Sequence, residues 1–424
     1  MITDGTELIS PAYYGENGAP HDIWTQLRRE SPVHWCEPAG YQPFWAITRH
    51  ADICEISKRP ADFSNAVDGI VILSEEQRLM RNEDGSFGQM RTIIEMDPPE
   101  HRDFRKVASP WFTPRALAKI DAAIDLSAKE VVDSLASNSG EGECDFAIKV
   151  ATAHPLRVLA TALGVPREQE PDILRLTNEL FGADDPDMQR EGENRREATQ
   201  ALGLELFQLF NSIIEDRRQN PKDDLATILA TAEIDGKPMG PMETFGYFLI
   251  VFSAGHDTTK NALAGGLRAL FENPVEFQKL RDDPTLVAKA VEEIVRWTSP
   301  VNYMKRTAQC DVEIRGKKIA AGDSLALFYA SANRDEDLFD NPFDFRVDRD
   351  PNRHLGFGIG EHFCLGANFA RRSQAAILRE LLGRLESAEV IQGGVTQIHS
   401  SFVVGLKSLP VRYRLRDGAK IGSR

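Results

Sequence analysis

One cysteine, Cys364, lies in a sequence context that favours chemistry. It belongs to the segment F-G-I-G-E-H-F-C-L-G, residues 357–366, whose three glycines let the backbone lie close to a flat partner. A helix-forming run follows at residues 367–385, so the sulfur precedes a helix N-terminus, whose positive dipole end stabilises an anion. The spacing F-x-x-G-x-x-x-C-x-G arises by chance in roughly one chain in a thousand. We interpret Cys364 as a functional thiolate, although a lone cysteine is more often an inert buried residue.

A second polar group interrupts the apolar helical run that begins near Met242. The segment A-G-H-D-T-T, residues 254–259, places the small residues Ala254 and Gly255 before an acid and an alcohol, Asp257 and Thr258. This order suggests a locally opened helix beside a ligand, because glycine in a helix interior costs about 1 kcal/mol relative to alanine. The alternative is a helix with a packing glycine and a solvated Asp257. The segment alone does not decide between them.

Composition limits the possible functions. The 424 residues are 42% hydrophobic, which is enough for a large core, and the net charge of −15 gives no basic surface for nucleic acid or anionic lipid. The five cysteines are an odd number, widely separated and without a C-x-x-C pair, so neither a disulfide framework nor a zinc site is expected. Any cysteine chemistry must therefore come from one residue acting alone.

The sequence shows no sign of a membrane segment. No apolar run approaches the roughly 18 to 20 residues that cross a bilayer, and the N-terminus has neither a basic start nor an apolar block. We therefore expect a cytoplasmic protein.

Periodicity predicts a chain dominated by helices. Apolar residues recur at helical spacing over residues 117–137, 152–163, 195–219 and 242–271. Strand signals occur at 312–319, where a tight turn is expected around residues 315–317, then at 325–329 and in 395–415. Residues 341–366 are too rich in proline and glycine for regular structure. We expect a single α-rich domain with small β-sheets over residues 1–424.

The loop around Cys364 resembles the haem-binding loop of cytochromes P450, and further motifs of that family appear in the expected order along about the whole chain. The resemblance implies a mainly α fold shaped as a triangular prism, with haem b (iron protoporphyrin IX) between the long central helix and the cysteine loop. Cys364 would be the axial ligand of the haem iron. The other implied cofactor contacts of the loop and the helix are Phe357, Gly358, Gly366 and Ala254.

The acid–alcohol pair acquires a role through the same resemblance. Activating O2 on haem needs two protons and a pocket closed to bulk water, which suits an acid and a hydroxyl on the distal wall. Asp257 and Thr258 match the pair that performs this task in the family. His256 is not part of the family's pair, and we interpret it as structural.

Further polar residues match family positions around the haem. Its propionates need cationic partners, and His101 and Arg105, one helical turn apart, match two of them. Arg306 and His362 match two more propionate contacts. By contrast, three residues match a buried network that supports folding of the haem pocket, and these are Glu293, Arg296 and Arg349.

The electron source is expected to be a separate protein. The chain has no dinucleotide fingerprint and no room for a fused flavin reductase, and similar bacterial proteins usually take electrons from a ferredoxin served by a ferredoxin reductase. Basic residues that could dock an acidic ferredoxin, or could be ordinary surface charges, are Arg105, Lys106, Arg115, Arg371 and Arg372. We expect no nucleic-acid or membrane partner and a monomeric protein.

The substrate is predicted only by class. The expected pocket segments, 66–73, 181–183, 250–254, 301–302 and 401–403, are mostly apolar, which suits a small or medium hydrophobic molecule. The individual pocket candidates are Ile250, Ser253, Ala254, Val301, Asn302 and Phe402. Framework segments such as 40–45 and 352–358 resemble the bacterial branch that includes the α-terpineol hydroxylase, which points to a monoterpenoid or an alkyl-aromatic hydrocarbon.

The predicted reaction is O2-dependent hydroxylation of an unactivated C–H bond. Alternatives are a haem-thiolate peroxygenase that uses hydrogen peroxide, a hydroxylase of a fatty acid or a steroid, and a non-catalytic haem sensor. The pair Asp257-Thr258 argues against the peroxygenase, because peroxide already brings the protons. The small Ala254-Gly255 wall argues against a sensor, because sensors generally fill both axial positions.

Overall fold

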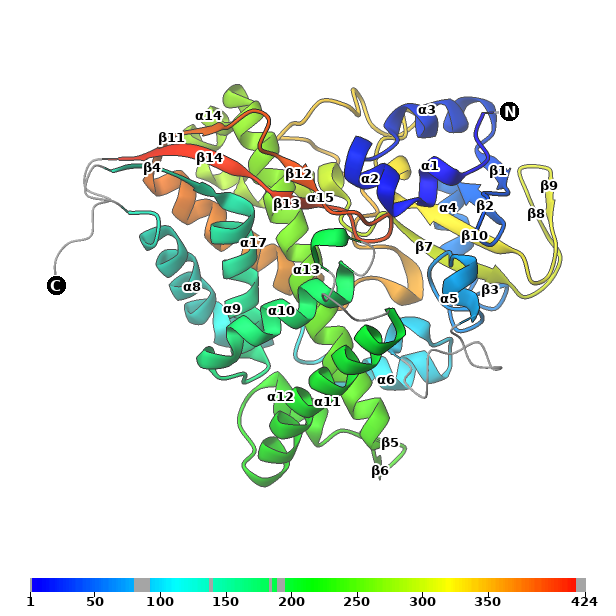
Figure 1. Cartoon of the computed structure of the whole chain (residues 1–424), viewed down its shortest axis with the longest axis horizontal. Helices are drawn as coiled ribbons and strands as arrows, with labels where there is room; N and C mark the ends of the chain where they lie inside the picture. Colours follow the sequence, from blue (N-terminus) through cyan, green and yellow to red (C-terminus); the bar gives the residue numbers. More distant parts are fainter. Residues whose placement is uncertain (1, 80–91, 137–139, 183–184, 189–194, 417–424) are drawn as a thin grey trace.

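A 32-residue helix, α13 (Pro241–Glu272), runs through the middle of the molecule (Figure 1). The computed structural model describes residues 2–79, 92–136, 140–182, 185–188 and 195–416. Proline at the first helical position favours the start of α13 because it has no backbone N–H to leave unpaired, and Glu243 in the first turn faces the positive end of the helix dipole. Its apolar residues are buried around most of its circumference, as expected for a helix enclosed by others.

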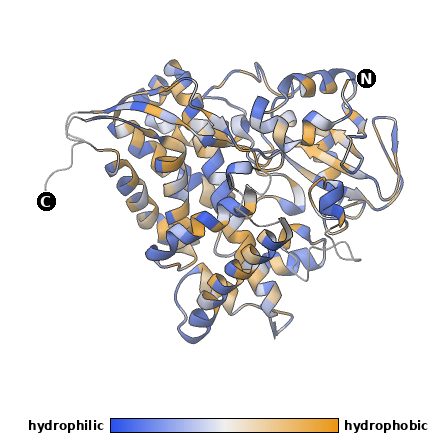
Figure 2. Cartoon of the chain, in the orientation of Figure 1, coloured by the Kyte–Doolittle hydropathy of each residue, from blue (hydrophilic) through white to orange (hydrophobic). Residues whose placement is uncertain are grey.

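The helices of the first half of the chain are α1 (Thr6–Ile9), α2 (Pro11–Asn17), α3 (His21–Glu30), α4 (His50–Ser57), α5 (Glu75–Leu79), α6 (Glu100–Ala108), α7 (Pro114–Leu117), α8 (Asp121–Asp133), α9 (Ala153–Ala162) and α10 (Glu170–Phe181). Of these, α8 to α10 lie beside α13 on one side of the molecule (Figure 1). The later ones are α11 (Arg195–Gln219), α12 (Leu225–Ala230), α14 (Pro274–Asp282), α15 (Val287–Thr298), α16 (Tyr329–Ala332) and α17 (Ala367–Arg384). Figure 2 shows hydrophobic residues concentrated on the faces that these helices turn toward one another.

The opposite side of the molecule carries the largest sheet, near α1 to α4 (Figure 1). Its five strands lie in the order β1 (Val33–Cys36), β2 (Phe44–Ile47), β10 (Ser324–Phe328), β7 (Tyr303–Ala308) and β3 (Phe63–Ser64). Strand β10 is parallel to β2 and antiparallel to β7, and all five of its residues are buried. This burial fixes β7, whose residues Met304 and Arg306 reach the site described below.

Smaller sheets complete the described structure. One contains β11 (Leu385–Val390), β14 (Pro410–Leu415) and β4 (Glu141–Asp145), and the two-stranded sheets pair β12 (Thr396–Gln397) with β13 (Leu406–Ser408), β5 (Glu233–Ile234) with β6 (Lys237–Pro238), and β8 (Val312–Ile314) with β9 (Lys317–Ile319). The β8–β9 turn places Arg315 and Gly316 at φ of 48° and 72°, which confirms the tight turn predicted around residues 315–317.

The structure is mainly helical with small sheets, as predicted. The helix expected over 195–219 is present throughout that range and ends at Gln219 as predicted, and the one over 242–271 differs by one residue at each end. The helix expected over 117–137 is shorter, because residues 118–120 form a 3₁₀ turn before α8. No described helix has both the length and the apolar character that crossing a membrane requires.

Candidate active site

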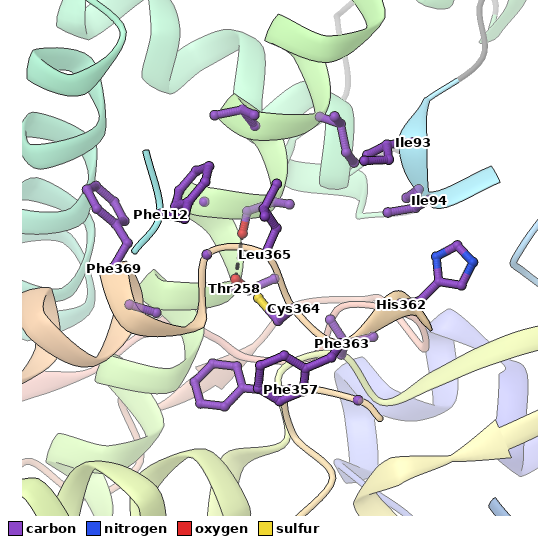
Figure 3. A pocket seen from close by; sticks show the side chains of 18 of the residues that line it. Ile93, Ile94, Phe112, Thr258, Phe357, His362, Phe363, Cys364, Leu365 and Phe369 are labelled. Atoms are coloured by element: carbon purple, nitrogen blue, oxygen red, sulfur yellow. Dashed lines mark hydrogen bonds between the residues drawn. The ribbon is translucent and has the colours of Figure 1, made fainter. Parts of the chain in front are cut away.

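A cavity lies between α13, the start of α17, α6, β7 and the loop that contains Cys364. Cys364 lines it from the loop, and Thr258 lines it from α13 (Figure 3). The loop has no regular structure except a 3₁₀ turn at 360–362, as expected from its glycines. Three predicted cofactor contacts, Phe357, Gly358 and Gly366, also line the cavity.

The loop geometry explains two of its glycines. Gly358 and Gly360 have positive φ values, 67° and 78°, which side chains disfavour. A Cβ on Gly360 would lie 2.5 Å from the carbonyl oxygen of Ser57, so residue 360 must also remain small. At Gly358 the nearest atom to such a Cβ is 3.6 Å away, and at Gly366 it is 3.9 Å away. A Cβ at these two cavity-facing positions would make only ordinary contacts with the chain, so the protein does not crowd them, which fits a flat group lying against the loop.

Cys364 is half-buried where it lines the cavity, and its partial loss of solvent disfavours the free anion of the thiol. Burial raises the pKa of Cys364, while the N–H of Gly366 and the charges of Arg105 and Arg371 act in the opposite direction. The backbone N–H of Cys364 donates to the carbonyl of Phe357 at 2.8 Å, which fixes the residue in the loop. A bound metal cation would stabilise a thiolate here, and the iron of haem would meet this requirement.

Four cationic or hydrogen-bonding side chains meet at another part of the cavity, namely His101, Arg105, Arg306 and His362. The rings of His101 and His362 are 4.0 Å apart, and the buried atoms His101 Nδ1 and His362 Nε2 have no hydrogen-bond partner. Burial, together with Arg306, His101 and Arg105, lowers the pKa of His362 to about 2. Buried polar atoms normally have partners, so this group fits an anion such as the two haem propionates.

The predicted folding network is assembled as one buried unit. Arg296 Nε and Nη2 donate to Glu293 at 2.7 Å each, and both side chains are fully buried. Arg349 Nε completes the network at 3.2 and 3.1 Å from the two Glu293 oxygens. Arg296 and Arg349 also donate to backbone carbonyls of the segment 340–344, so the network fixes the chain that leads to the cysteine loop.

The cavity wall on α13 differs from the locally opened helix that we expected. Ala254, Gly255 and Thr258 line the cavity, but the helix is continuous through them. The hydroxyl of Thr258 donates to the carbonyl of Ala254 at 2.6 Å. A Cβ on Gly255 would lie 3.2 Å from Leu159, so this glycine also permits close packing against α9. Gly255 therefore lines the cavity and packs against α9 within an unbroken helix, and the predicted opening of the helix is wrong.

Asp257 lies outside the set of residues that line the cavity. Its carboxylate is buried and forms an ion pair with Lys260, and it accepts a hydrogen bond from Asn261 Nδ2 at 3.2 Å. His256 is also buried, and burial lowers its pKa to about 4, so the ring is neutral near pH 7. The structure thus brings Thr258 and Cys364 to one cavity and holds the acid on an adjacent face of α13.

The structure places only some of the predicted pocket residues in the cavity wall. Ile250, Ala254 and Val301 line the cavity, whereas Ser253, Asn302 and Phe402 do not. The amide of Asn302 instead donates to the hydroxyl of Tyr14 and the carbonyl of Ser401, at 2.8 Å each. Phe402 packs against Tyr303 with ring centroids 5.7 Å apart. Ala183, from the expected segment 181–183, lies outside the described residues.

Sequence reasoning missed several cavity residues, including Ile93, Ile94, Met304 and Tyr247. Figure 3 shows Ile93 and Ile94 in the wall of the pocket. Ile93 and Ile94 lie in a short 3₁₀ turn, whereas Met304 belongs to β7 and Tyr247 to α13. Their place in the cavity depends on contacts with residues far away in the sequence, so the local sequence gives no signal for it.

The proposed docking arginines have partners within the chain. Arg371 binds Glu292 through Nε and Nη2 at 2.6 and 2.8 Å, and Arg372 forms an ion pair with Asp121. Arg105 lines the cavity and donates to the carbonyl of Phe363 at 2.7 Å. These contacts give the arginines structural roles beside any part in docking.

Comparisons with known proteins agree with this geometry. Residues 14–414 match the protein family described as Cytochrome P450. Cytochrome P450-terp from Pseudomonas sp is 37% identical over 415 residues, which cover 96% of each chain. The methyl-branched lipid omega-hydroxylase of Mycobacterium tuberculosis is 36% identical over 96% of this chain and 95% of its own. Linalool 8-monooxygenase of Pseudomonas putida is 35% identical over 96% of this chain and 98% of its own.

The fold has close counterparts among solved structures. The crystal structure of CYP108D1 from Novosphingobium aromaticivorans superposes with a TM-score of 0.88 at 37% identity, covering 97% of this chain and 98% of that one. This similarity confirms the fold class expected from the resemblance.

Proposed function

The chain belongs to the cytochrome P450 family and is a haem-dependent monooxygenase, and from this premise we propose that it hydroxylates a small or medium hydrophobic molecule. A monoterpenoid or an alkyl-aromatic hydrocarbon is the first candidate. The observation that carries the proposal is the cavity that contains Cys364 and Thr258 and is otherwise walled mainly by apolar side chains.

The roles of the cofactor-binding residues follow from their positions. Bound haem supplies an iron centre at which O2 is activated, and a thiolate ligand favours O–O cleavage by donating electron density. Cys364 would hold the iron, with Gly358 and Gly366 leaving room for the ring. His101, Arg105, Arg306 and His362 would hold the propionates.

Proton supply is assigned to Asp257 and Thr258. Thr258 reaches the cavity, and Asp257 precedes it on α13 with a buried carboxylate. The carboxylate would have to turn from Lys260 toward the cavity to pass a proton to the Thr258 side. General acid–base groups of this kind contribute about 100-fold or more to rates.

The substrate class rests on the cavity wall. Ile93, Ile94, Ile250, Val301 and Met304 are apolar, and the Thr258 hydroxyl already has a carbonyl partner. Such a wall favours a ligand held by shape and apolar contact. The similarity to linalool 8-monooxygenase supports a terpenoid, and the similarity to the methyl-branched lipid omega-hydroxylase supports a branched aliphatic lipid as the second candidate.

Electrons have to come from a redox partner, as for other members of the family, and we assign this role to a ferredoxin with its reductase. Acidic ferredoxins dock through charge complementarity, so their association should weaken as salt increases.

A spectroscopic screen tests the substrate proposal. Ferric haem-loaded protein would be titrated with monoterpenes, alkylbenzenes, branched fatty acids and steroids, and the low-spin to high-spin optical shift would be recorded. We expect the largest shifts and the tightest binding with monoterpenes or alkylbenzenes, and hydroxylated products from the same compounds with a ferredoxin system. Tight binding and turnover of steroids alone would contradict the proposed class.

A further inference from the structure

Arg371 lies on α17, against the loop that contains Cys364. Its guanidinium carbon is 4.5 Å from the centroid of the Phe357 ring, and the Phe357 carbonyl accepts the hydrogen bond from the Cys364 N–H at 2.8 Å. Phe357 therefore contacts both the guanidinium of Arg371 and the backbone of Cys364. Stacking on the ring also fixes the distance of the cation from the loop, because a planar guanidinium keeps its orientation on an aromatic face.

The charge of Arg371 is offset by one carboxylate, Glu292 on α15. Glu292 accepts from Arg371 in a bidentate pair and from His354 Nε2 at 3.0 Å. Burial raises the pKa of Glu292, but the hydrogen bonds from His354 and Arg371 outweigh it and lower the value to about 2. Glu292 is therefore charged throughout the neutral range.

His354 joins Glu292 to the start of the cysteine loop through its two ring nitrogens. The backbone N–H of Gly356 donates to His354 Nδ1 at 3.1 Å, and His354 Nε2 donates to Glu292 at 3.0 Å. The ion pair behind the cysteine loop therefore consists of the cation Arg371 and the anion Glu292, and His354 holds the carboxylate in place.

We propose that Arg371 and Glu292 are positioning residues that set the electron-donating strength of the Cys364 thiolate, and with it the reduction potential of the haem. The proposal rests on the assignment of Cys364 as the iron ligand. A nearby cation stabilises negative charge on the sulfur, so less electron density reaches the iron and the ferrous state becomes easier to form. Glu292 opposes this effect by partly neutralising the cation.

The same arginine is also a candidate for docking a ferredoxin, and the two roles make different predictions. Replacing a docking residue would weaken only the complex with ferredoxin. Replacing an electrostatic residue would change the reduction potential of the isolated haem protein, and replacing Arg371 or Glu292 would shift that potential in opposite directions. A purely structural role gives no such opposition, because removing either partner would disturb the same contact.

The test is the midpoint reduction potential of the isolated haem-loaded protein, measured by spectroelectrochemical titration without substrate or ferredoxin. We expect Arg371→Gln to lower the potential, so that the ferrous-to-ferric ratio at a fixed applied potential falls severalfold. Glu292→Gln should raise that ratio, and Arg371→Lys should stay nearer to the unmodified protein. Arg372→Gln is the matched control, since this neighbouring arginine pairs with Asp121, and we expect no change from it.

Shifts of the same sign in Arg371→Gln and Glu292→Gln, or no shift in either, would overturn the proposal. An unchanged potential with weaker ferredoxin binding in Arg371→Gln would assign the arginine to docking instead. If Arg371→Gln does not retain haem, the sign of the Glu292→Gln shift still decides. The spectrum of the carbon monoxide complex of each ferrous variant distinguishes failure of this proposal from failure of the assignment of Cys364 as the iron ligand. Loss of Cys364 as the ligand would change the type of Soret band, whereas loss of the electrostatic effect would change only the reduction potential.

Discussion

At the scale of single residues, the polar groups of the site differ in their partners: Asp257 is paired inside the protein, whereas His101 and His362 each keep a buried ring nitrogen without a hydrogen-bond partner. The sequence predicts which residue types are needed, and the structure shows where each one points. Thr258 reaches the cavity, but Asp257 is turned to Lys260 and Asn261. The sequence motif could not predict that Asp257 forms a buried ion pair with Lys260. An acid and a lysine three residues apart on a helix most often form an exposed pair.

Proton delivery can be tested at Asp257. We expect Asp257→Asn to lower the rate of product formation by about 100-fold, because an amide cannot relay a proton. The measurement is product and hydrogen peroxide formed per electron supplied, with a substrate from the binding screen.

The matched pair of threonines provides the control for this prediction. Thr258 and Thr259 both line the cavity, and each hydroxyl donates to the carbonyl four residues earlier. We expect Thr258→Ala to divert electrons to peroxide and Thr259→Ala to divert far fewer. Equal effects of the two replacements, or unchanged product formation in Asp257→Asn, would remove the acid–alcohol pair from the account.

At the scale of elements, long periodic helices were predictable and local detail was not. The helix over 195–219 and its end at Gln219 were predictable, because its apolar spacing is regular over many turns. The opening expected at Ala254-Gly255 is absent, because α13 accommodates the glycine by packing against Leu159 and continues as a helix. Asn302 and Phe402 were expected at the cavity from their place in the chain, but they join the packing around Tyr14 and Tyr303 instead.

The buried network between α15 and the segment before the cysteine loop gives a prediction about stability. Replacing Glu293 with Gln leaves Arg296 and Arg349 without their carboxylate in a fully buried site. Breaking a buried ion pair in this way costs about 3–5 kcal/mol, so we expect a large loss of folding stability and of haem content. Urea unfolding and the haem-to-protein absorbance ratio would measure both.

An exposed pair on the neighbouring helix is the control for Glu293. Arg268 and Glu272 are four residues apart on α13, and their side chains are each 37% exposed. We expect Glu272→Gln to cost no more than about 0.5 kcal/mol. A comparable stability loss in Glu272→Gln and Glu293→Gln would show that burial of the network does not matter.

At the scale of the whole molecule, the sequence identified the architecture through a few motifs rather than through composition. The cysteine loop and the motifs at 254–259 and 293–296 lie far apart in the chain, and folding brings the first two to one cavity while the third supports the loop. The walls of that cavity could not be predicted in full, since Ile93, Ile94 and Met304 reach it only through the arrangement of the sheet and α6. For the same reason the sequence indicates a substrate class and not a single compound.

The most direct test of the central claim is the optical spectrum of the reduced, haem-loaded protein under carbon monoxide, compared with Cys364→Ser and with Cys310→Ser, which alters an exposed cysteine. We predict the red-shifted Soret band of a thiolate-ligated haem in the unmodified protein and in Cys310→Ser, and its loss in Cys364→Ser. A thiolate-type band that persists in Cys364→Ser, or an imidazole-type band in the unmodified protein, would contradict the assignment of this sulfur to the iron.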